Sequence, residues 1–180
     1  HNPKTWGTSY DSIEAPRPVT MICAIDARVP HPALISFNIA SLSENPSTPK
    51  GLGRRQRVLN VIRRLLAACD ILCLQETRLG RYNKTALAAH FPDFECYYNN
   101  LAIGKAGTMI LVRKSYSAKF LVEEISHVDS VRGRVQSLKF NSLDHPGVPK
   151  ASFGVSNLYL KSGHFMDERF AQLASLLTLD

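Results

Sequence analysis

The segment DILCLQETRL, residues 70–79, constrains the fold of this chain more than any other stretch. Ile71 to Leu74 form a short, unbroken apolar run, which is typical of a strand that is buried on both faces. The run ends abruptly in polar residues, and Glu76 stands just beyond it. Because the strand fixes the backbone at its end, we expect the Glu76 carboxylate to be held rigidly.

The chain from residue 33 onward predicts helices early and late, with a run of strands between them. ALISFN, residues 33–38, indicates a strand by its β-branched and aromatic content. Residues 53–68 predict a helix, because apolar residues recur there at the helical period. This order is typical of an α+β fold, a layered α/β sandwich, and not of a strict alternation of strands and helices. The other predicted elements are strands at 94–99, 107–113, 119–125, 133–140 and 152–160, a helix at 84–91 that Asn83 could cap, and a last helix at 167–179.

The first 32 residues differ from the rest, since they carry several prolines and little apolar periodicity. We interpret residues 1–32 as a leader or linker, with a short apolar strand around 19–25, and residues 33–180 as part of a domain. Residues 40–51 are expected to form a loop. The chain starts with His1 and not with Met, so we expect it to begin inside a longer product. No apolar run approaches the roughly 18 residues of a membrane span.

The net charge of +7 and the isoelectric point near 9.4 favour a polyanionic partner, most simply nucleic acid. Part of this charge lies on the helix at 53–68. Its arginines form either a solvated helix face, which we favour, or a surface for the nucleic acid backbone. These residues are Arg54, Arg55, Arg57, Arg63 and Arg64.

The four cysteines fit no zinc-binding spacing and are expected to be buried, reduced thiols. This expectation weakly favours an intracellular setting. The residues are Cys23, Cys69, Cys73 and Cys96.

Three predicted strands end in polar residues that could bind a metal ion or a phosphate group. Glu76 suits Mg²⁺, a hard cation that needs only one or two protein carboxylates; alternatively it is a surface residue paired with Arg78. Asn38 either caps the following loop or holds a phosphate oxygen or orients a metal-bound carboxylate. Tyr159 shares one strand face with Asn157, and its alternative is a buried tyrosine with a satisfied hydroxyl. Together these ends predict a site at one rim of a sheet.

The order of these segments resembles the first half of the endonuclease/exonuclease/phosphatase superfamily, over about residues 33–179. Its members include AP endonucleases, endonuclease domains of non-LTR retrotransposons, and DNase I. LQET after a buried strand is the most specific element of the resemblance. The matching segments are ISFNIASL, DILCLQETRL, AGTMILVRK, RGRVQSLKF and SNLYLKSG.

The resemblance implies a DNase I-like four-layer fold and Mg²⁺-dependent hydrolysis of phosphodiester bonds in DNA. It implies that Glu76 binds the metal and that Asn38 helps to organise the metal and phosphate site. Tyr159 falls where AP endonucleases and many retrotransposon nucleases carry an active-site tyrosine, while other branches usually carry histidine. This favours a DNA nuclease of the repair or retrotransposon type, for which the setting would be nuclear. The residues just past Glu76 are then the best placed for DNA: Arg78, Arg81, Tyr82 and Lys84.

The superfamily's later Asp/Asn and Asp-His motifs have no counterpart after Tyr159. We therefore expect this chain alone to have little or no activity, and the missing half of the domain to come from a longer polypeptide or from a complementing chain. We also expect the strand TMILV, residues 108–112, to keep an apolar face with no partner.

Two other functions stay open at this stage. One is a phosphatase or phosphodiesterase of the same superfamily that acts on lipid or nucleotide. The other is a non-enzymatic remnant that binds nucleic acid. The remnant predicts DNA binding that is indifferent to Glu76→Ala and to removal of metal.

Overall fold

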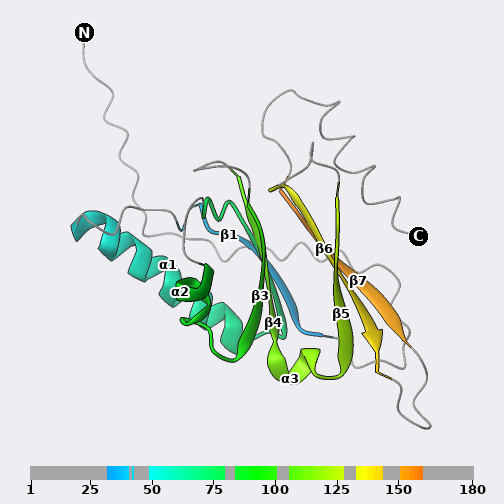
Figure 1. The fold of residues 1–180 in the computed structure, drawn as a ribbon. Helices are drawn as coiled ribbons and strands as arrows, with labels where there is room; N and C mark the ends of the chain where they lie inside the picture. Colours follow the sequence, from blue (N-terminus) through cyan, green and yellow to red (C-terminus); the bar gives the residue numbers. More distant parts are fainter. Residues whose placement is uncertain are drawn as a thin grey trace.

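The computed structural model describes residues 32–40, 42, 49–79, 84–100, 106–127, 133–143 and 151–159. Strands and helices follow one another there in a mixed order (Figure 1). They are β1 (Leu34–Asn38), α1 (Pro49–Ala67), β2 (Ile71–Gln75), α2 (Lys84–Ala88), β3 (Phe94–Asn99), β4 (Thr108–Arg113), α3 (Lys114–Ser117), β5 (Phe120–Ile125), β6 (Val135–Ser142) and β7 (Ser152–Leu158).

The strands form two sheets, one with the order β1-β2-β4-β3 and one with the order β5-β6-β7. β1 and β2 are parallel, so their carboxyl ends lie at the same edge of the first sheet. The other strand pairs are antiparallel. In Figure 1 the two sheets pack against each other, and α1 and α2 cover the face of the first sheet that points away from the second sheet. The predicted α+β layered sandwich is confirmed.

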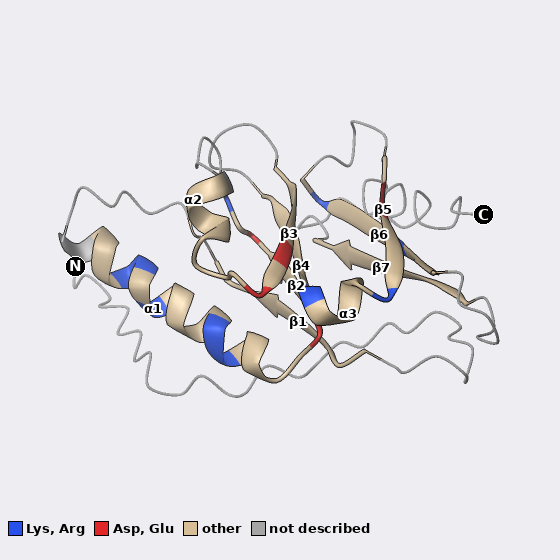
Figure 2. Cartoon of the chain, turned by 60° about the horizontal axis from the view of Figure 1, so that its bottom comes forward, with Lys and Arg blue, Asp and Glu red and all other residues tan. Residues whose placement is uncertain are grey.

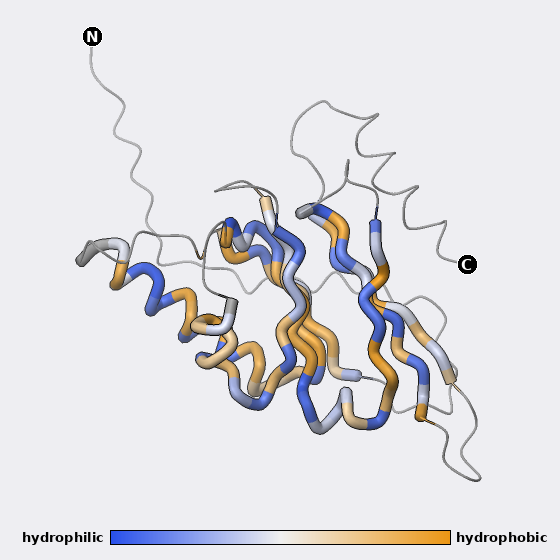
Figure 3. The backbone as a smooth tube through the Cα atoms, in the orientation of Figure 1, coloured by the Kyte–Doolittle hydropathy of each residue, from blue (hydrophilic) through white to orange (hydrophobic). Residues whose placement is uncertain are grey.

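β2 is buried along its whole length, as its sequence predicted. Leu72 and Leu74 belong to an apolar cluster that includes Leu59 and Ile62 of α1. On the other face, Ile71 and Cys73 belong to a second apolar cluster, which lies between the two sheets. Orange segments run through both sheets in Figure 3. The first sheet is therefore the central layer of the described structure.

The expectation of an unpartnered apolar face on TMILV is wrong. Thr108, Ile110 and Val112 are fully buried, and the last two pack in the cluster between the sheets. Met109 and Leu111 pack on the helical side. The chain already contains β6 and β7, whose apolar side chains cover this face, so no further partner is needed for β4.

The helices differ from the prediction in three places, one of which is that α2 ends at Ala88 and not near residue 91. α1 begins at Pro49 and not near residue 53, because proline is compatible with the first turn of a helix, where its missing N–H is not required. α3, which joins β4 to β5, was not predicted and is only 4 residues long. The predicted elements at 19–25 and 167–179, and the predicted cap Asn83, lie outside the described residues.

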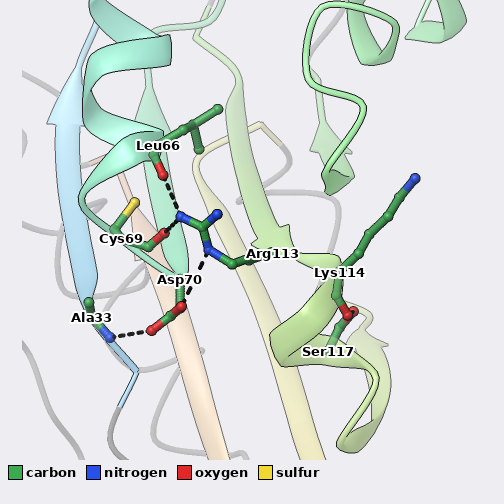
Figure 4. Close-up of polar contacts among 7 residues, drawn as sticks. All are labelled: Ala33, Leu66, Cys69, Asp70, Arg113, Lys114 and Ser117. Atoms are coloured by element: carbon green, nitrogen blue, oxygen red, sulfur yellow. Dashed lines mark hydrogen bonds and ion pairs between the residues drawn. The ribbon is translucent and has the colours of Figure 1, made fainter.

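The carboxyl end of α1 is held by an arginine from β4 (Figure 4). The Arg113 guanidinium donates hydrogen bonds to the carbonyl oxygens of Leu66 at 2.6 Å and Cys69 at 2.7 Å. It also lies 3.5 Å from the Asp70 carboxylate, which accepts a hydrogen bond from the Ala33 N–H. Carbonyl groups at a helix end lack partners within the helix, so this arginine satisfies two groups that would otherwise need water.

The cysteines within the described residues are free thiols; Cys69 and Cys73 are buried as predicted, whereas Cys96 is only partly buried. Burial raises the pKa of Cys69 to about 11 and that of Cys73 to about 12, so both thiols stay protonated and unreactive at neutral pH. Cys23 lies outside the described residues. In the described part of the chain, no helix combines the length and apolar character that a membrane crossing requires.

Candidate active site at a shared rim of the two sheets

The carboxyl ends of β1, β2 and β7 meet at one rim of the sandwich. The parallel register pairs Asn38 with Gln75, which places Asn38 beside the start of the loop that carries Glu76. Backbone hydrogen bonds continue past the strands, from the Ile39 N–H to the Gln75 carbonyl oxygen at 3.1 Å. β7 reaches the same rim from the second sheet and ends just before Tyr159.

Asn38 has two roles at this rim. Its side-chain oxygen accepts a hydrogen bond of 2.9 Å from the Ala40 N–H, which caps the following loop. Its amide nitrogen donates a hydrogen bond of 2.9 Å to Glu76 Oε1. The oxygen of Asn38 therefore contacts the loop, and its nitrogen is directed at the Glu76 carboxylate.

The second carboxylate oxygen of Glu76 lies 2.9 Å from Arg78 Nη2, so the alternative reading of Glu76 as a paired residue describes a real contact. The Tyr159 hydroxyl also lies close enough to the Glu76 carboxylate for each group to shift the pKa of the other. Three of the predicted site residues and Arg78 are therefore brought together, although Asn38 and Tyr159 come from different sheets.

These contacts shift two pKa values in opposite directions. The hydrogen bond from Asn38 is the main cause that lowers the pKa of Glu76, and contacts with Tyr159 and Arg78 add to it against the opposing effect of burial. Burial and the hydrogen bond with Glu76 raise the pKa of Tyr159. At neutral pH the pair therefore consists of an ionised carboxylate and a protonated hydroxyl that can donate.

The backbone at this rim is strained. Ala40, Glu76, Arg78 and Ala106 have positive φ angles between 48° and 55°, a region that L-residues adopt rarely. Hydrogen bonds hold them there, such as that from the Arg78 N–H to the Ala106 carbonyl oxygen at 2.8 Å. Positive φ angles of non-glycine residues cluster at functional sites, which supports a functional role for this rim.

Arg134 is a site residue that the sequence did not reveal. Its guanidinium lies 5.1 Å from the centre of the Tyr159 ring, and its Nη1 is 3.4 Å from the Tyr159 carbonyl oxygen. The Tyr159 N–H in turn donates to the Arg134 carbonyl oxygen at 2.7 Å. The only sequence signal was its place in GRV just before β6, which does not specify a contact with a residue 25 positions later.

The side chains of the other predicted nucleic-acid contacts lie outside what the structure describes. Arg81 and Tyr82 lie outside the described residues, and of Lys84 only the backbone, at the start of α2, is described. The arginines of α1 form blue segments along that helix in Figure 2, on the far side of the first sheet from β7. The favoured reading of these side chains as a helix face away from the rim is consistent with this placement.

Among the described residues, the site fits a hard divalent cation only through the single carboxylate of Glu76. In the described ranges, no three His, Cys, Asp or Glu side chains lie close enough together to hold a metal ion. Glu76 alone offers an ionised carboxylate whose side chain is 18% exposed. Mg²⁺ usually keeps several waters and needs only one or two carboxylates, so this oxygen ligand is suitable for it.

A family model described as the endonuclease/exonuclease/phosphatase family matches residues 35–174. This chain belongs to that family. Endonuclease/exonuclease/phosphatase enzymes cleave phosphate esters and generally depend on a divalent metal ion. A comparison with curated protein sequences finds no match.

Solved structures of the endonuclease/exonuclease/phosphatase fold are similar to this chain. The AP endonuclease LMAP from Leishmania major has 19% identity and a TM-score of 0.51, with 79% of this chain and 44% of that chain covered. Truncated TDP2 from Caenorhabditis elegans has 24% identity and a TM-score of 0.51, with 79% and 52% covered. The APE2 catalytic domain from Xenopus laevis has 17% identity and a TM-score of 0.50, with 78% and 49% covered. At these identities the similarity shows the fold, and this chain spans about half the length of each structure.

Proposed function

We propose that the rim formed by Asn38, Glu76 and Tyr159 serves metal-assisted hydrolysis of phosphodiester bonds in DNA. The observation that carries the proposal is the convergence of these residues from three strands and two sheets on one ionised carboxylate. Family membership supports phosphate-ester chemistry. The net charge of +7 supports a polyanionic substrate.

Each residue has a defined part in this proposal. Glu76 would hold Mg²⁺, which supplies a Lewis acid that polarises a phosphate oxygen and stabilises a leaving oxygen. Asn38 keeps the carboxylate ionised and oriented through its 2.9 Å hydrogen bond. Tyr159 keeps its proton and can donate a hydrogen bond to a phosphate oxygen as negative charge develops there.

The more specific parts of the proposal concern the substrate and the rest of the site. The tyrosine at position 159 resembles that of AP endonucleases and retrotransposon nucleases, which favours a DNA nuclease of one of these types. Arg78, Arg81, Tyr82 and Lys84 are proposed to contact the DNA. One carboxylate is a weak metal site, so the proposal takes further ligands and a general base from residues other than these three, either in the same polypeptide or in a second chain. Low activity of the 180-residue chain by itself stays a prediction.

Metal binding tests the proposal directly, because it does not require turnover. Titration of the chain with Mn²⁺, followed by calorimetry, should give a binding isotherm that Glu76→Gln removes. Glu123→Gln is a matched control, since Glu123 is an exposed carboxylate that also accepts a hydrogen bond from an asparagine, Asn141 at 3.2 Å. Unchanged Mn²⁺ binding by the Glu76→Gln variant would overturn the proposal.

Nicking of supercoiled plasmid with Mg²⁺, compared with release of inorganic phosphate from lipid and nucleotide substrates, then separates a nuclease from a phosphatase. DNA binding that does not change with Glu76→Ala or with EDTA would instead favour the non-enzymatic function.

A further inference from the structure

Two buried amide side chains connect the sheets directly beneath the candidate site. Asn157 of β7 is 2% exposed, and Gln75 of β2 is 8% exposed. Gln75 Nε2 donates a hydrogen bond of 2.6 Å to Asn157 Oδ1. The same nitrogen lies 2.9 Å from the Ser36 hydroxyl on β1. The Gln75–Asn157 pair therefore joins three strands by directional contacts inside a largely apolar core.

The orientation of both amides is fixed by the backbone around them. Asn157 Nδ2 donates to the carbonyl oxygens of Leu74 at 3.0 Å and Met109 at 3.1 Å. Carbonyl oxygens only accept, so the nitrogen of Asn157 must face them and its oxygen must face Gln75. The pair can satisfy its hydrogen bonds only when β7 has one particular position along β2 and β4.

Apolar packing alone would not fix the position of β7 relative to the first sheet. Asn99 at the end of β3 also links the sheets, through hydrogen bonds with the Val135 carbonyl oxygen of β6 and the Gly133 N–H. The other contacts between the sheets include apolar ones that join Ile110 and Val112 to residues such as Phe140 and Val155. Burial of such side chains is favourable but non-directional, so it permits small shifts of one sheet along the other. Hydrogen-bonded amides lose most of their energy when they are misaligned, and an unsatisfied buried amide costs free energy.

The pair is also adjacent in sequence to the site residues on both sides. Gln75 directly precedes Glu76, and Asn157 lies two positions before Tyr159, on the same strand face. Glu76 follows a strand of the first sheet and Tyr159 follows a strand of the second, so their separation depends on how the sheets are aligned at this rim. The two side chains are near enough to shift each other's pKa.

We infer that Gln75 and Asn157 form a positioning pair that sets the distance between Glu76 and Tyr159. This inference rests on the proposed function for its catalytic meaning, since it assigns a purpose to the alignment of those two residues. The pair does not touch the substrate. It fixes where the first sheet presents the carboxylate and where the second sheet presents the hydroxyl.

A double-mutant cycle tests this inference without metal or DNA. The coupling between Glu76→Gln and Tyr159→Phe is measured from urea unfolding of the 180-residue chain, first in the wild-type background and then with Asn157→Leu. Leucine keeps the branching and the number of side-chain heavy atoms of asparagine and removes its hydrogen bonds. We expect the Glu76–Tyr159 coupling to be present in the wild type and lost with Asn157→Leu.

Val155→Ala is the matched control, because Val155 is buried on the same strand and on the same face and makes no such hydrogen bond. It should destabilise the fold and leave the coupling intact. Equal coupling in the Asn157→Leu and Val155→Ala backgrounds would overturn the inference, as would absence of coupling in the wild type. If Asn157→Leu does not fold, Gln75→Met provides the same test from the other sheet.

The outcome is independent of the metal titration. Coupling that depends on Asn157, combined with Mn²⁺ binding that ignores Glu76, would uphold the positioning pair and overturn the proposed function. Loss of Mn²⁺ binding in Glu76→Gln, combined with coupling that ignores Asn157, would overturn the positioning pair alone.

Discussion

The side-chain amide of Asn38 donates a hydrogen bond of 2.9 Å to the carboxylate of Glu76, although the two residues are 38 positions apart. The contact follows from the parallel pairing of β1 and β2, which places Asn38 opposite Gln75. Because Asn38 is also held by the Ala40 N–H, it presents its nitrogen to the carboxylate in a fixed orientation. The lowered pKa of Glu76 is therefore largely a consequence of strand register.

Asn38→Ala should raise the pKa of Glu76 toward its ordinary value, because the largest cause of its lowering is removed. The change should also destabilise the fold by about 0.5–1.5 kcal/mol, the usual net value of a hydrogen bond. NMR titration of ¹³C-labelled glutamate measures the pKa directly. Asn141→Ala removes a comparable amide–carboxylate contact at Glu123 and should leave Glu76 unaffected. A Glu76 pKa that is the same with and without the Asn38 side chain would contradict this account.

Glu76→Gln should reduce stability at neutral pH and much less in acid. A carboxylate whose pKa is lowered by folding contributes stability above the unfolded pKa of about 4.3, and this contribution is lost as the pH falls through the lower folded value. The difference in unfolding free energy between wild type and variant should therefore shrink below about pH 4. Urea unfolding at a series of pH values measures it. A difference that stays constant from pH 7 to pH 3 would show that ionisation of Glu76 does not contribute to the unfolding free energy.

The elements of the central sheet could be predicted from sequence because each has a strong local pattern. β2 has an unbroken apolar run, and β3 occupies residues 94–99 as predicted. Asn38, Glu76 and Tyr159 were chosen as polar residues at strand ends, and strand ends that share a rim bring such residues together. In these cases a local rule and the global arrangement agree.

Features that depend on packing between elements could not be predicted. The contact of Arg134 with Tyr159 depends on the pairing of β6 with β7, and the hydrogen bonds of Asn157 depend on the alignment of the two sheets. The sequence showed that Asn157 shares a face with Tyr159, but not that it is buried in the core. The apolar face of TMILV was misjudged for the same reason, since its partners lie more than twenty residues further along the chain.

Gly107→Ala should destabilise the fold and disturb the rim. Gly107 has a φ of 102°, and a Cβ there would lie 2.4 Å from Thr77 Oγ1 and 3.2 Å from the Arg78 nitrogen. Backbone strain of this kind costs about 1–3 kcal/mol, and the displaced residues follow Glu76 directly, so Mn²⁺ affinity should fall as well.

Gly154→Ala is the control for this change, because a Cβ there meets only the Leu138 carbonyl oxygen at 3.8 Å. It should be neutral or stabilise β7 by about 0.5–1 kcal/mol. Thermal unfolding of both variants distinguishes them, and equal effects would show that the space around Gly107 is not restrictive.

Thr108→Val should stabilise the protein. The Thr108 hydroxyl is buried and has no hydrogen-bond partner in the described structure, so it was desolvated without compensation. Valine has nearly the same shape and removes that cost, which predicts a gain of about 1 kcal/mol in unfolding free energy by urea titration.

Thr77→Val is the opposite case and should destabilise the protein, because it removes the hydrogen bond of 3.4 Å that the buried Thr77 hydroxyl donates to Asn100 Oδ1. A loss of stability in Thr108→Val would indicate that its hydroxyl has a partner after all.

Arg113→Ala should destabilise the end of the sandwich that lies away from the candidate site. Arg113 satisfies the carbonyl oxygens of Leu66 and Cys69, and its guanidinium lies 4.8 Å from the centre of the Phe94 ring. Loss of these contacts should cost about 1–3 kcal/mol, because hydrogen bonds from a charged group are stronger than neutral ones. Arg113→Lys should recover little of it, since an ammonium group lacks the planar fork that reaches two carbonyl oxygens at once.

Mn²⁺ affinity at Glu76 should stay unchanged in both variants, because Arg113 and Thr108 are opposite ends of β4 and only Thr108 pairs with Gln75 at the rim. Hydrogen exchange of the last turn of α1 measures the local effect, and protection that persists in Arg113→Ala would show that water replaces the guanidinium without loss.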